Sequence, residues 1–172
     1  MSEIPQKISI EKAKKDKLFY FVANVIVYRD DGRCLILKRS DKEVAHPGKY
    51  CVPGGKLEWS DYDINNPTRI NGNILDYEDA VEKLLIREVK EEAGIIIDKH
   101  FKYINSIGFI RPDEVPAILL KFAARYVSGE IILEKGSFTD YAWVNSEEIK
   151  EYSCIKGVPE EIEKTIELFR KH

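Results

Sequence analysis

Residues 84–95, LLIREVKEEAGI, constrain the fold of this chain more than any other stretch. Their apolar side chains recur at helical spacing, and Gly94 follows as a typical helix C-terminus. Glu88, Glu91 and Glu92 fall within about a third of the helix circumference, because successive residues are about 100° apart. The stretch therefore predicts a helix that buries one face against a sheet and carries a strip of carboxylates beside that face.

This strip of carboxylates is unfavourable for an isolated helix. Like charges three or four residues apart destabilise a helix by about 0.2–0.5 kcal/mol per pair, and the helix dipole disfavours negative charge near the C-terminus. A divalent cation would reverse the sign of the interaction, since Mg²⁺ binds carboxylate oxygens together with water and substrate phosphates. The alternative is a solvated acidic face, which is common on surface helices.

Composition and charge restrict the class of protein. The chain has 172 residues, of which 44% are hydrophobic and 33% are charged, as in an ordinary globular domain. Its formal net charge of -3 predicts no stable nucleic acid partner and no membrane partner. No apolar run approaches the roughly 18–20 residues that span a bilayer, and the N-terminus lacks the apolar core of a secretory signal.

The cysteines indicate a cellular compartment. Cys34, Cys51 and Cys154 are widely spaced and form no CxxC pair, so neither a zinc site nor a disulfide framework is expected. A reducing, cytoplasmic location follows from this pattern.

Hydrophobic periodicity predicts a mixed order of strands and helices. Residues 18–38 predict a hairpin around the turn RDDGR, and YCV is a short strand followed by a tight PGG turn. Further predicted elements are strands at 102–111, 116–127 and 140–144, a helical turn within 145–152, and an amphipathic helix at 158–172. We expect an N-terminal arm at 1–17 and a single α/β domain at 18–172.

The segment before the acidic helix has a different character. Residues 60–75 are polar and carry Asn-Pro and Asn-Gly turn signals, and Ile70 and Ile74 flank the Asn-Gly in a pattern that allows a small hairpin. Asp76 is the predicted N-cap of the helix, with Asp79 three residues later as in a capping box.

Two motifs together resemble the signature of the Nudix hydrolase family. The signature reads G, five residues, E, seven residues, R-E, an aliphatic residue, x, E-E, x, G and an aliphatic residue. PGGKLE at 53–58 supplies the glycine, and REVKEEAGI at 87–95 matches the second half throughout. Counting back eight from Arg87 puts Asp79 in the place of the first glutamate. Gly55 then lies 24 residues before Asp79 (79 − 55) rather than six, which indicates an insertion of about 18 residues at about 59–76.

The resemblance covers roughly residues 18–150 and implies both a fold and an activity. The fold is an α/β/α sandwich with a mixed β-sheet, in which the signature forms a loop–helix–loop motif. The activity is a Mg²⁺-dependent pyrophosphohydrolase, with Mn²⁺ as a substitute, that cleaves a nucleoside diphosphate linked to another moiety. A nucleoside triphosphate or a nucleotide sugar such as ADP-ribose would be the small-molecule substrate. The alternative is a catalytically silent Nudix-like domain that binds a nucleotide or a protein, and the intact glutamates favour the enzyme.

The same resemblance assigns roles around the acidic helix. Glu88 and Glu92 would be the principal metal ligands, Glu91 would bind a further ion or position water, and the backbone carbonyl of Gly55 would complete the metal shell. Arg87 would orient a neighbouring carboxylate, either Asp79 or Glu91. The general base in the family is either a signature glutamate or an acid from a loop outside the signature. The loop candidates are Glu134 first, as an extra metal ligand or as the base, and then Asp140 and Glu114.

Candidate substrate contacts come from basic and aromatic residues near the glycine turn. Arg39 and Lys56 are candidates for phosphate contacts, with surface solvation as the alternative for each. Trp59, Tyr62 and Arg69 lie in the predicted insertion, which we expect to emerge beside the site either as a substrate-selecting flap or as a tolerated surface loop. The sequence leaves a homodimer open.

Overall fold

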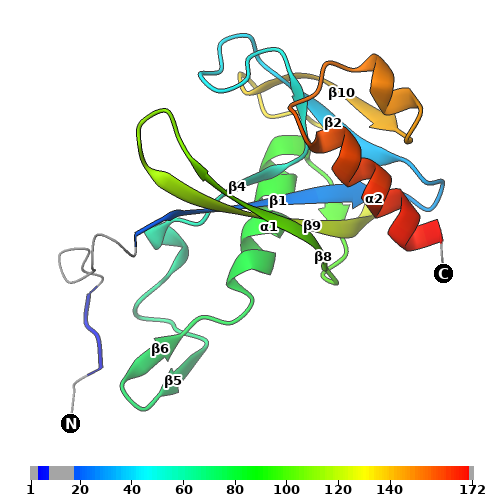
Figure 1. Ribbon diagram of the computed structural model, residues 1–172. Coiled ribbons are helices and arrows are strands. Elements are labelled where there is room, and N and C mark those ends of the chain that lie inside the picture. The colour runs from blue at the N-terminus through cyan, green and yellow to red at the C-terminus, as the bar shows by residue number, and fades with distance from the viewer. Residues whose placement is uncertain (1–3, 8–17, 171–172) are drawn as a thin grey trace.

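A single mixed β-sheet forms the centre of the molecule (Figure 1). The computed structural model describes residues 4–7 and 18–170. Within them, eight strands join in the order β10-β2-β1-β9-β7, with β3 on β2, β4 on β1 and β8 on β9. The strands are β1 (Tyr20–Tyr28), β2 (Cys34–Arg39), β3 (Tyr50–Cys51), β4 (Gly54–Lys56), β7 (Ile96–Ile97), β8 (Lys102–Ile110), β9 (Pro116–Ser128) and β10 (Phe138–Val144). The pairing of β1 with β9 is parallel and the other pairings are antiparallel, so the predicted mixed sheet is confirmed.

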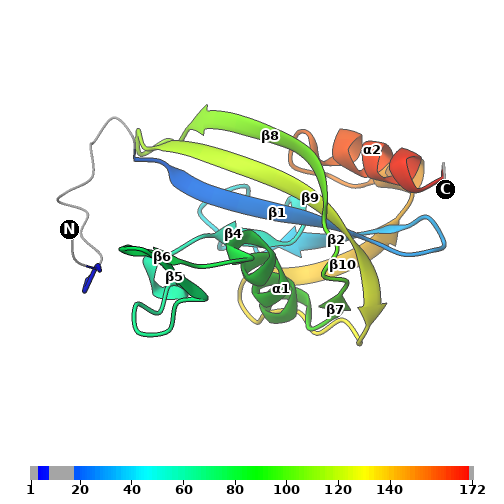
Figure 2. The same cartoon turned by 90° about the horizontal axis from the view of Figure 1, so that it is seen from below.

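One long helix covers each face of the sheet, as Figure 2 shows. Helix α1 (Ala80–Ala93) buries Leu84, Leu85, Val89 and Ala93 in one core, and helix α2 (Val158–Arg170) buries Val158, Ile162 and Ile166 in the other. Neighbouring residues of β1 face opposite layers, because side chains alternate along a strand: Val25 belongs to the α1 core and Ile26 to the α2 core. The predicted α/β/α sandwich is confirmed.

The start of the acidic helix differs from its prediction. Asp76 does not cap the helix, because it ends strand β6 (Ile74–Asp76), where its carboxylate accepts a hydrogen bond of 2.9 Å from Arg69 Nε. Asp79 immediately precedes α1 in the left-handed conformation (φ 56°), and its side chain caps nothing. The helix begins at Ala80 because the preceding residues are used in a hairpin between β5 (Arg69–Asn71) and β6.

Two other local predictions are confirmed, and a third is wrong in part. The small hairpin around Asn-Gly is confirmed as β5–β6, and the helical turn at 145–152 is the 3-10 helix η4 (Glu148–Glu151). The predicted PGG turn is wrong in part, because residues 54–56 form strand β4 against β1. Most of the predicted arm at 1–17 lies outside the described residues. No helix in the described ranges is long and apolar enough to cross a membrane.

A buried ion pair fastens α2 to the sheet. The Lys121 ammonium on β9 contacts the Glu161 carboxylate on α2, and both side chains are almost completely buried. Burial raises the pKa of Glu161, whereas the hydrogen bond from Lys121 acts in the opposite direction. Each charge is tolerated in this layer because the other is present, since an unpaired buried charge is strongly destabilising.

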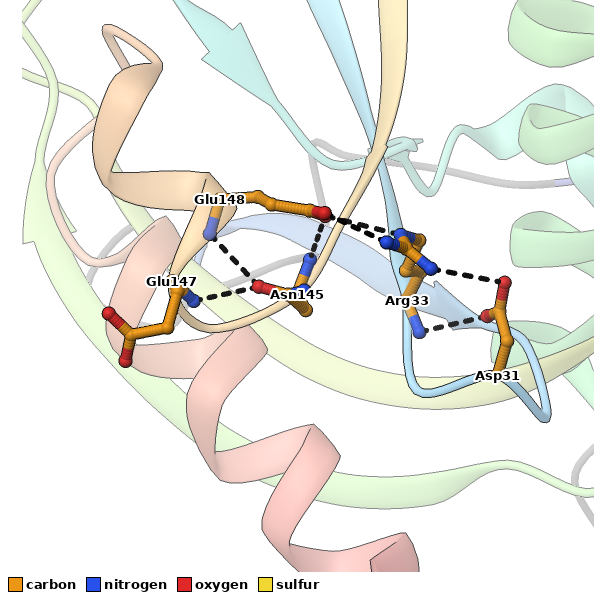
Figure 3. A network of polar contacts seen from close by, with 5 residues as sticks. All are labelled: Asp31, Arg33, Asn145, Glu147 and Glu148. Carbon is orange, nitrogen blue, oxygen red and sulfur yellow. Dashed lines mark hydrogen bonds and ion pairs between the residues drawn. The ribbon is translucent and has the colours of Figure 1, made fainter.

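A polar network at the surface fastens the β1–β2 turn to the segment after β10 (Figure 3). The Arg33 guanidinium donates to both carboxylate oxygens of Glu148, at 3.2 and 2.8 Å. The Asn145 side chain accepts hydrogen bonds of 2.9 Å from the backbone N–H groups of Glu147 and Glu148. The network fixes the start of η4 against the turn by charge-assisted hydrogen bonds.

Replacement of Glu148 by Gln should destabilise the protein near neutral pH and much less in acid. The Arg33 hydrogen bond lowers the pKa of Glu148 below its usual value of 4.5. A folded-state pKa below the unfolded value gives stability that is present above the unfolded pKa and is lost as pH falls. Urea midpoints of Glu148→Gln and wild type should therefore converge as pH is lowered from about 7 to about 3.

The matched control for this measurement is Glu147→Gln. The Glu147 carboxylate is exposed and contacts Lys150 within the same turn, so its loss should change the midpoint little at any pH. A destabilisation by Glu148→Gln that is constant across the pH range would contradict the assigned role of the Arg33 contact.

Candidate active site

The glycine strand β4 lies directly against the acidic helix α1. A Cβ atom on Gly55 would lie 2.3 Å from Glu88 Cδ and 2.4 Å from Glu88 Oε1, so only glycine fits beside this carboxyl group. The backbone N–H of Gly54 donates a hydrogen bond of 3.0 Å to Glu92 Oε2. The structure thus brings the predicted Gly55 together with two of the predicted glutamates, although they are separated by more than thirty residues of chain.

The acid cluster consists of Glu88, Glu92 and Glu134, and the carboxyl pKa values of Glu88 and Glu92 are raised. Burial raises the pKa of Glu92 to about 8; the Gly54 N–H opposes this shift, and the charges of Glu88 and Glu134 add to it. Burial also raises the pKa of Glu88, against the effect of Arg87 and with further contributions from neighbouring carboxylates. Raised carboxylate pKa values that arise from burial and from like charge are typical of functional sites.

Arg87 pairs with carboxylates on helix α1 and on the loop that follows β4. Its guanidinium lies 2.9 Å from Glu88, 3.3 Å from Glu91 and 3.3 Å from Asp61. Of the two partners that the sequence left open, the structure shows Glu91, and Asp79 is not among the ion pairs of Arg87. Arg87 therefore links the acidic helix to the loop that follows β4.

Sequence reasoning missed Asp61. It ends the 3-10 helix η3 (Trp59–Asp61) and also accepts a hydrogen bond of 2.8 Å from the Glu58 N–H. A signal was available, because Asp61 lies six residues after Gly55 (61 − 55), which is the spacing of the first acid in the signature. With Asp61 in that place, the extra residues run from 62 to 79 rather than from 59 to 76.

Glu134 is the general-base candidate that the structure brings to the cluster. It lies in the loop after β9, where its N–H donates to the Glu92 carbonyl at 3.1 Å, and its charge raises the pKa of both Glu88 and Glu92. The other candidates have different surroundings. Asp140 on β10 accepts a hydrogen bond of 2.6 Å from the Tyr50 hydroxyl, and Glu114 lies in the β8–β9 turn.

The predicted substrate contacts divide into two groups. Arg39 lowers the pKa of Glu92, so its charge acts on the acid cluster, and its guanidinium is held by Glu43 at 2.6 Å. Lys56 and Trp59 instead line a cavity of about 670 Å³ at the far end of β4. Tyr62 lines the same cavity, whereas Arg69 pairs with Asp76 and Glu78 inside the β5–β6 hairpin.

The chemistry of the acid cluster fits a divalent cation. Its donors are carboxylate oxygens beside a glycine backbone, which are the hard ligands that Mg²⁺ prefers. The charges of Glu88 and Glu134 raise the pKa of Glu92, and the charge of Glu134 also raises that of Glu88, so a cation among these carboxylates would offset their repulsion. In residues 4–7 and 18–170, no group of three acidic, histidine or cysteine side chains converges closely enough to hold an ion as it lies. Glu88 in particular is turned toward Arg87, so metal binding would require its carboxylate to reorient.

The sandwich fold and the glycine-backed acidic helix together define a known class of domain. A family model described as NUDIX domain matches residues 19–167, which is most of the chain. The chain therefore belongs to the Nudix family of hydrolases.

A curated relative supports this assignment. The chain is 32% identical over 119 residues to a protein named NAD-capped RNA hydrolase NudC from Pseudomonas aeruginosa, across 69% of this chain. The match covers 34% of the relative, so the chain spans about a third of the length of that protein.

Solved structures show the same fold. A MutT NUDIX hydrolase from Burkholderia pseudomallei has a TM-score of 0.64 at 21% identity, covering 86% of this chain and 98% of that one. The NUDIX domain of Shewanella oneidensis NrtR, in a cocrystal with ADP ribose, has a TM-score of 0.64 at 12% identity, covering 93% and 96%. An Ap4A hydrolase from C. elegans has a TM-score of 0.61 at 16% identity, covering 89% and 99%.

Alanine substitutions at the two glycines should have different consequences. A Cβ on Gly54 would meet backbone atoms of β1, at 2.3 Å from the Ala23 carbonyl oxygen, which cannot move without breaking the strand pair. A Cβ on Gly55 would meet the end of the flexible Glu88 side chain, which can swing away. Gly54→Ala should therefore lower the free energy of unfolding by about 1–3 kcal/mol, and Gly55→Ala by clearly less.

Urea denaturation of both variants beside wild type measures this difference. If both variants lost the same free energy of unfolding, or Gly55→Ala lost more, the Glu88 carboxyl would not be free to leave its place beside β4.

Proposed function

We propose that this protein is a Mg²⁺-dependent pyrophosphohydrolase that cleaves a nucleoside diphosphate linked to another moiety. A nucleoside triphosphate or a nucleotide sugar such as ADP-ribose is the proposed substrate. One observation carries the proposal: Glu88 and Glu92 lie together against the backbone of β4, with raised pKa values and with Glu134 acting on both. A diphosphate would be repelled by such a cluster unless a cation bridged the two.

The names of similar proteins agree with this substrate class. NAD, Ap4A and ADP ribose, which appear in the names of the relative and of two structural neighbours, all contain a phosphoanhydride linkage. The shared portion of the NudC relative is about a third of its length, so its RNA substrate is not part of the proposal. A small nucleotide is the proposed partner instead.

The residues of the acid cluster have different proposed roles. Glu88 and Glu92 would hold Mg²⁺, with Glu91 and the Gly55 carbonyl completing the shell, and the bound ion would supply neutralisation of the diphosphate charge. Glu134 is the proposed base that takes a proton from the attacking water as the water oxygen bonds to phosphorus. The bond between the attacked phosphorus and the bridging oxygen then breaks, and this oxygen leaves with the other phosphate. The products are a nucleoside monophosphate and the phosphorylated second moiety.

Two surrounding groups keep these carboxylates in place. The Gly54 N–H holds one oxygen of Glu92, which fixes that side chain even before an ion binds. Arg87 pairs with Glu91 on the helix and Asp61 on the loop, so it would position the helix beside the loop, and it would release Glu88 when that carboxylate turns to the ion. Arg39, whose charge acts on Glu92, is the proposed phosphate contact.

Cellular location and assembly form a secondary part of the proposal. A cytoplasmic location remains a prediction from the cysteine pattern. The proposed homodimer would form along strand β8. Within the described residues β8 pairs with β9 alone, so its outer edge is available to a second copy of the chain.

Hydrolysis should depend on Glu92. With Mg²⁺ and a panel of nucleoside triphosphates, nucleotide sugars and dinucleoside polyphosphates, wild type should release a nucleoside monophosphate from at least one compound. Glu92→Gln should lower kcat/KM by roughly 100-fold or more, because a metal ligand contributes several kcal/mol of charge stabilisation. Glu167→Gln, an equal loss of charge at an exposed site on α2, should match wild type. A wild type that equals Glu92→Gln on every compound would favour a catalytically silent nucleotide- or protein-binding domain.

Mg²⁺ should raise the melting temperature of the protein. At about 100-fold excess over its Kd, a ligand stabilises the folded state by about 2.7 kcal/mol, or roughly 5–10 °C for a chain of this size. The double variant Glu88→Gln, Glu92→Gln should lose this increment while keeping or exceeding the melting temperature of metal-free wild type, because it removes like-charge repulsion. NaCl at equal ionic strength is the control. If Mg²⁺ raised the melting temperature of the double variant as much as that of wild type, the ion would bind at another site.

A further inference from the structure

The cavity at the end of β4 is separate from the acid cluster and has a different chemical character. It lies between the start of β1 and the segment that follows β4, and Figure 1 shows these two parts of the chain side by side. We call it the aromatic cleft, defined by Phe19, Tyr20, Lys56, Trp59 and Tyr62. Its volume of about 670 Å³ lies within the range of about 300–1,000 Å³ that is usual for pockets that bind small organic ligands.

The aromatic side chains of the cleft are unusually open to solvent. Phe19 is 56% exposed, Trp59 47% and Tyr20 41%. Large rings gathered at a hollow surface cost free energy in water, and such patches mark binding sites. Flat ligands such as nucleobases fit such a surface best. Any nucleobase can stack on an aromatic ring, regardless of its pattern of hydrogen-bond donors and acceptors.

Two cationic groups lie against the Tyr20 ring of the cleft, and one of them, Lys56, lines the cleft itself. Lys56 Nζ lies 5.7 Å from the centre of the Tyr20 ring, and the Arg111 guanidinium lies 4.6 Å from it. Lys56 forms no ion pair with a carboxylate in the described part of the chain, whereas Arg111 pairs with Asp113 at 3.0 Å. Lys56 therefore offers a positive charge to an anionic group in the cleft, which Glu58 also lines.

The cleft and the acid cluster adjoin consecutive residues of β4. Lys56 follows Gly55 directly on β4, and the backbone of Gly55 lies against the Glu88 carboxyl. Because side chains alternate along a strand, the Lys56 side chain leaves the face of β4 opposite to the one that Glu88 contacts, and it lies over the Tyr20 ring. A nucleotide with its phosphates at the acid cluster would therefore extend around the end of β4, past Lys56, to place its base on the aromatic rings.

The segment after Asp61 builds one wall of the cleft. Tyr62 packs edge-on against Tyr77, with ring centres 5.0 Å apart, and the Tyr77 hydroxyl donates to the Asp63 carbonyl at 2.9 Å. The two ends of the extra segment are thereby tied together behind Tyr62. The segment acts as a support for this wall.

We propose that the aromatic cleft binds the nucleobase of the substrate, which stacks on Trp59 while Lys56 contacts the adjoining phosphate. The ligand class is therefore a nucleotide, in preference to a diphosphate without a base. The inference rests on the proposed function for the identity of the bound molecule as substrate, but its binding step requires neither metal nor turnover.

Trp59 itself reports on the cleft. The chain has two tryptophans, and the other, Trp143 on β10, lies under the Arg29 guanidinium, 3.7 Å from its ring centre. In a Trp143→Phe background, the fluorescence observed is that of Trp59. AMP added in EDTA should quench this fluorescence in a saturable manner, whereas ribose 5-phosphate, which has the same phosphate and no base, should not.

Substitutions then test the stacking surface by equilibrium dialysis of AMP. Trp59→Ala should weaken binding by about 5- to 150-fold, the fold-change equivalent of one base–aromatic stack, while Trp59→Phe should retain most of the affinity. Ile74→Ala is the control, because Ile74 is an exposed side chain of the β5–β6 hairpin outside the cleft. In the hydrolysis assay, Trp59→Ala should raise KM with little change in kcat.

Three results would overturn the assignment. Equal quenching by ribose 5-phosphate would reduce the cleft to a phosphate contact. If the Trp59 fluorescence changed with protein concentration but not with AMP, the cleft would be a contact with a second copy of the chain. Hydrolysis with an unchanged KM in Trp59→Ala would remove the cleft from the reaction while leaving the pyrophosphohydrolase intact. Conversely, base-dependent quenching without hydrolysis would support the cleft and contradict the proposed function.

Discussion

The contact between the glycine strand and the acidic helix is the constraint on which the rest of the site depends. Because Gly55 has no side chain, the Glu88 carboxyl can rest against the backbone of β4, and the N–H of Gly54 reaches Glu92. The strand is itself held to the centre of the sheet by its pairing with Ala23 and Asn24 on β1. The acid cluster and the cleft at the far end of β4 thus share one short rigid support, as a precise site requires.

This support holds an arrangement that is unfavourable by itself. The protein packs the apolar face of α1 into a core, and that burial compels the neighbouring glutamates to face one another in a partly desolvated space. Arg87 offsets part of the repulsion by pairing with Glu88, Glu91 and Asp61. Burial, and to a lesser extent the remaining repulsion, raises the pKa values of Glu88 and Glu92, and a cation with a bound diphosphate would neutralise their charges.

The sequence predicted regular elements better than their junctions. The long strands and both helices followed from hydrophobic periodicity, since each buries a face in one of two cores. The short strands β4, which was predicted as a turn, and β7 did not follow from it. Asp76 looked like a helix cap because aspartate favours that position, but pairing in the β5–β6 hairpin takes it away from the helix. Asp61 escaped notice because counting back from Arg87 followed the chain through the extra segment, whereas the ion pair reaches across that segment in space.

What the sequence determined by itself was the chemistry of the helix: the angular spacing of a helix places Glu88, Glu91 and Glu92 on one strip wherever the helix lies. Only the tertiary structure decided which distant groups join them. Glu134 reaches the cluster through the loop after β9, and the cleft brings Phe19 and Tyr20 beside Trp59. Local spacing fixes directions within one element, but distances between elements depend on strand pairing and on the packing of helices against the sheet, which involve residues far apart in the chain.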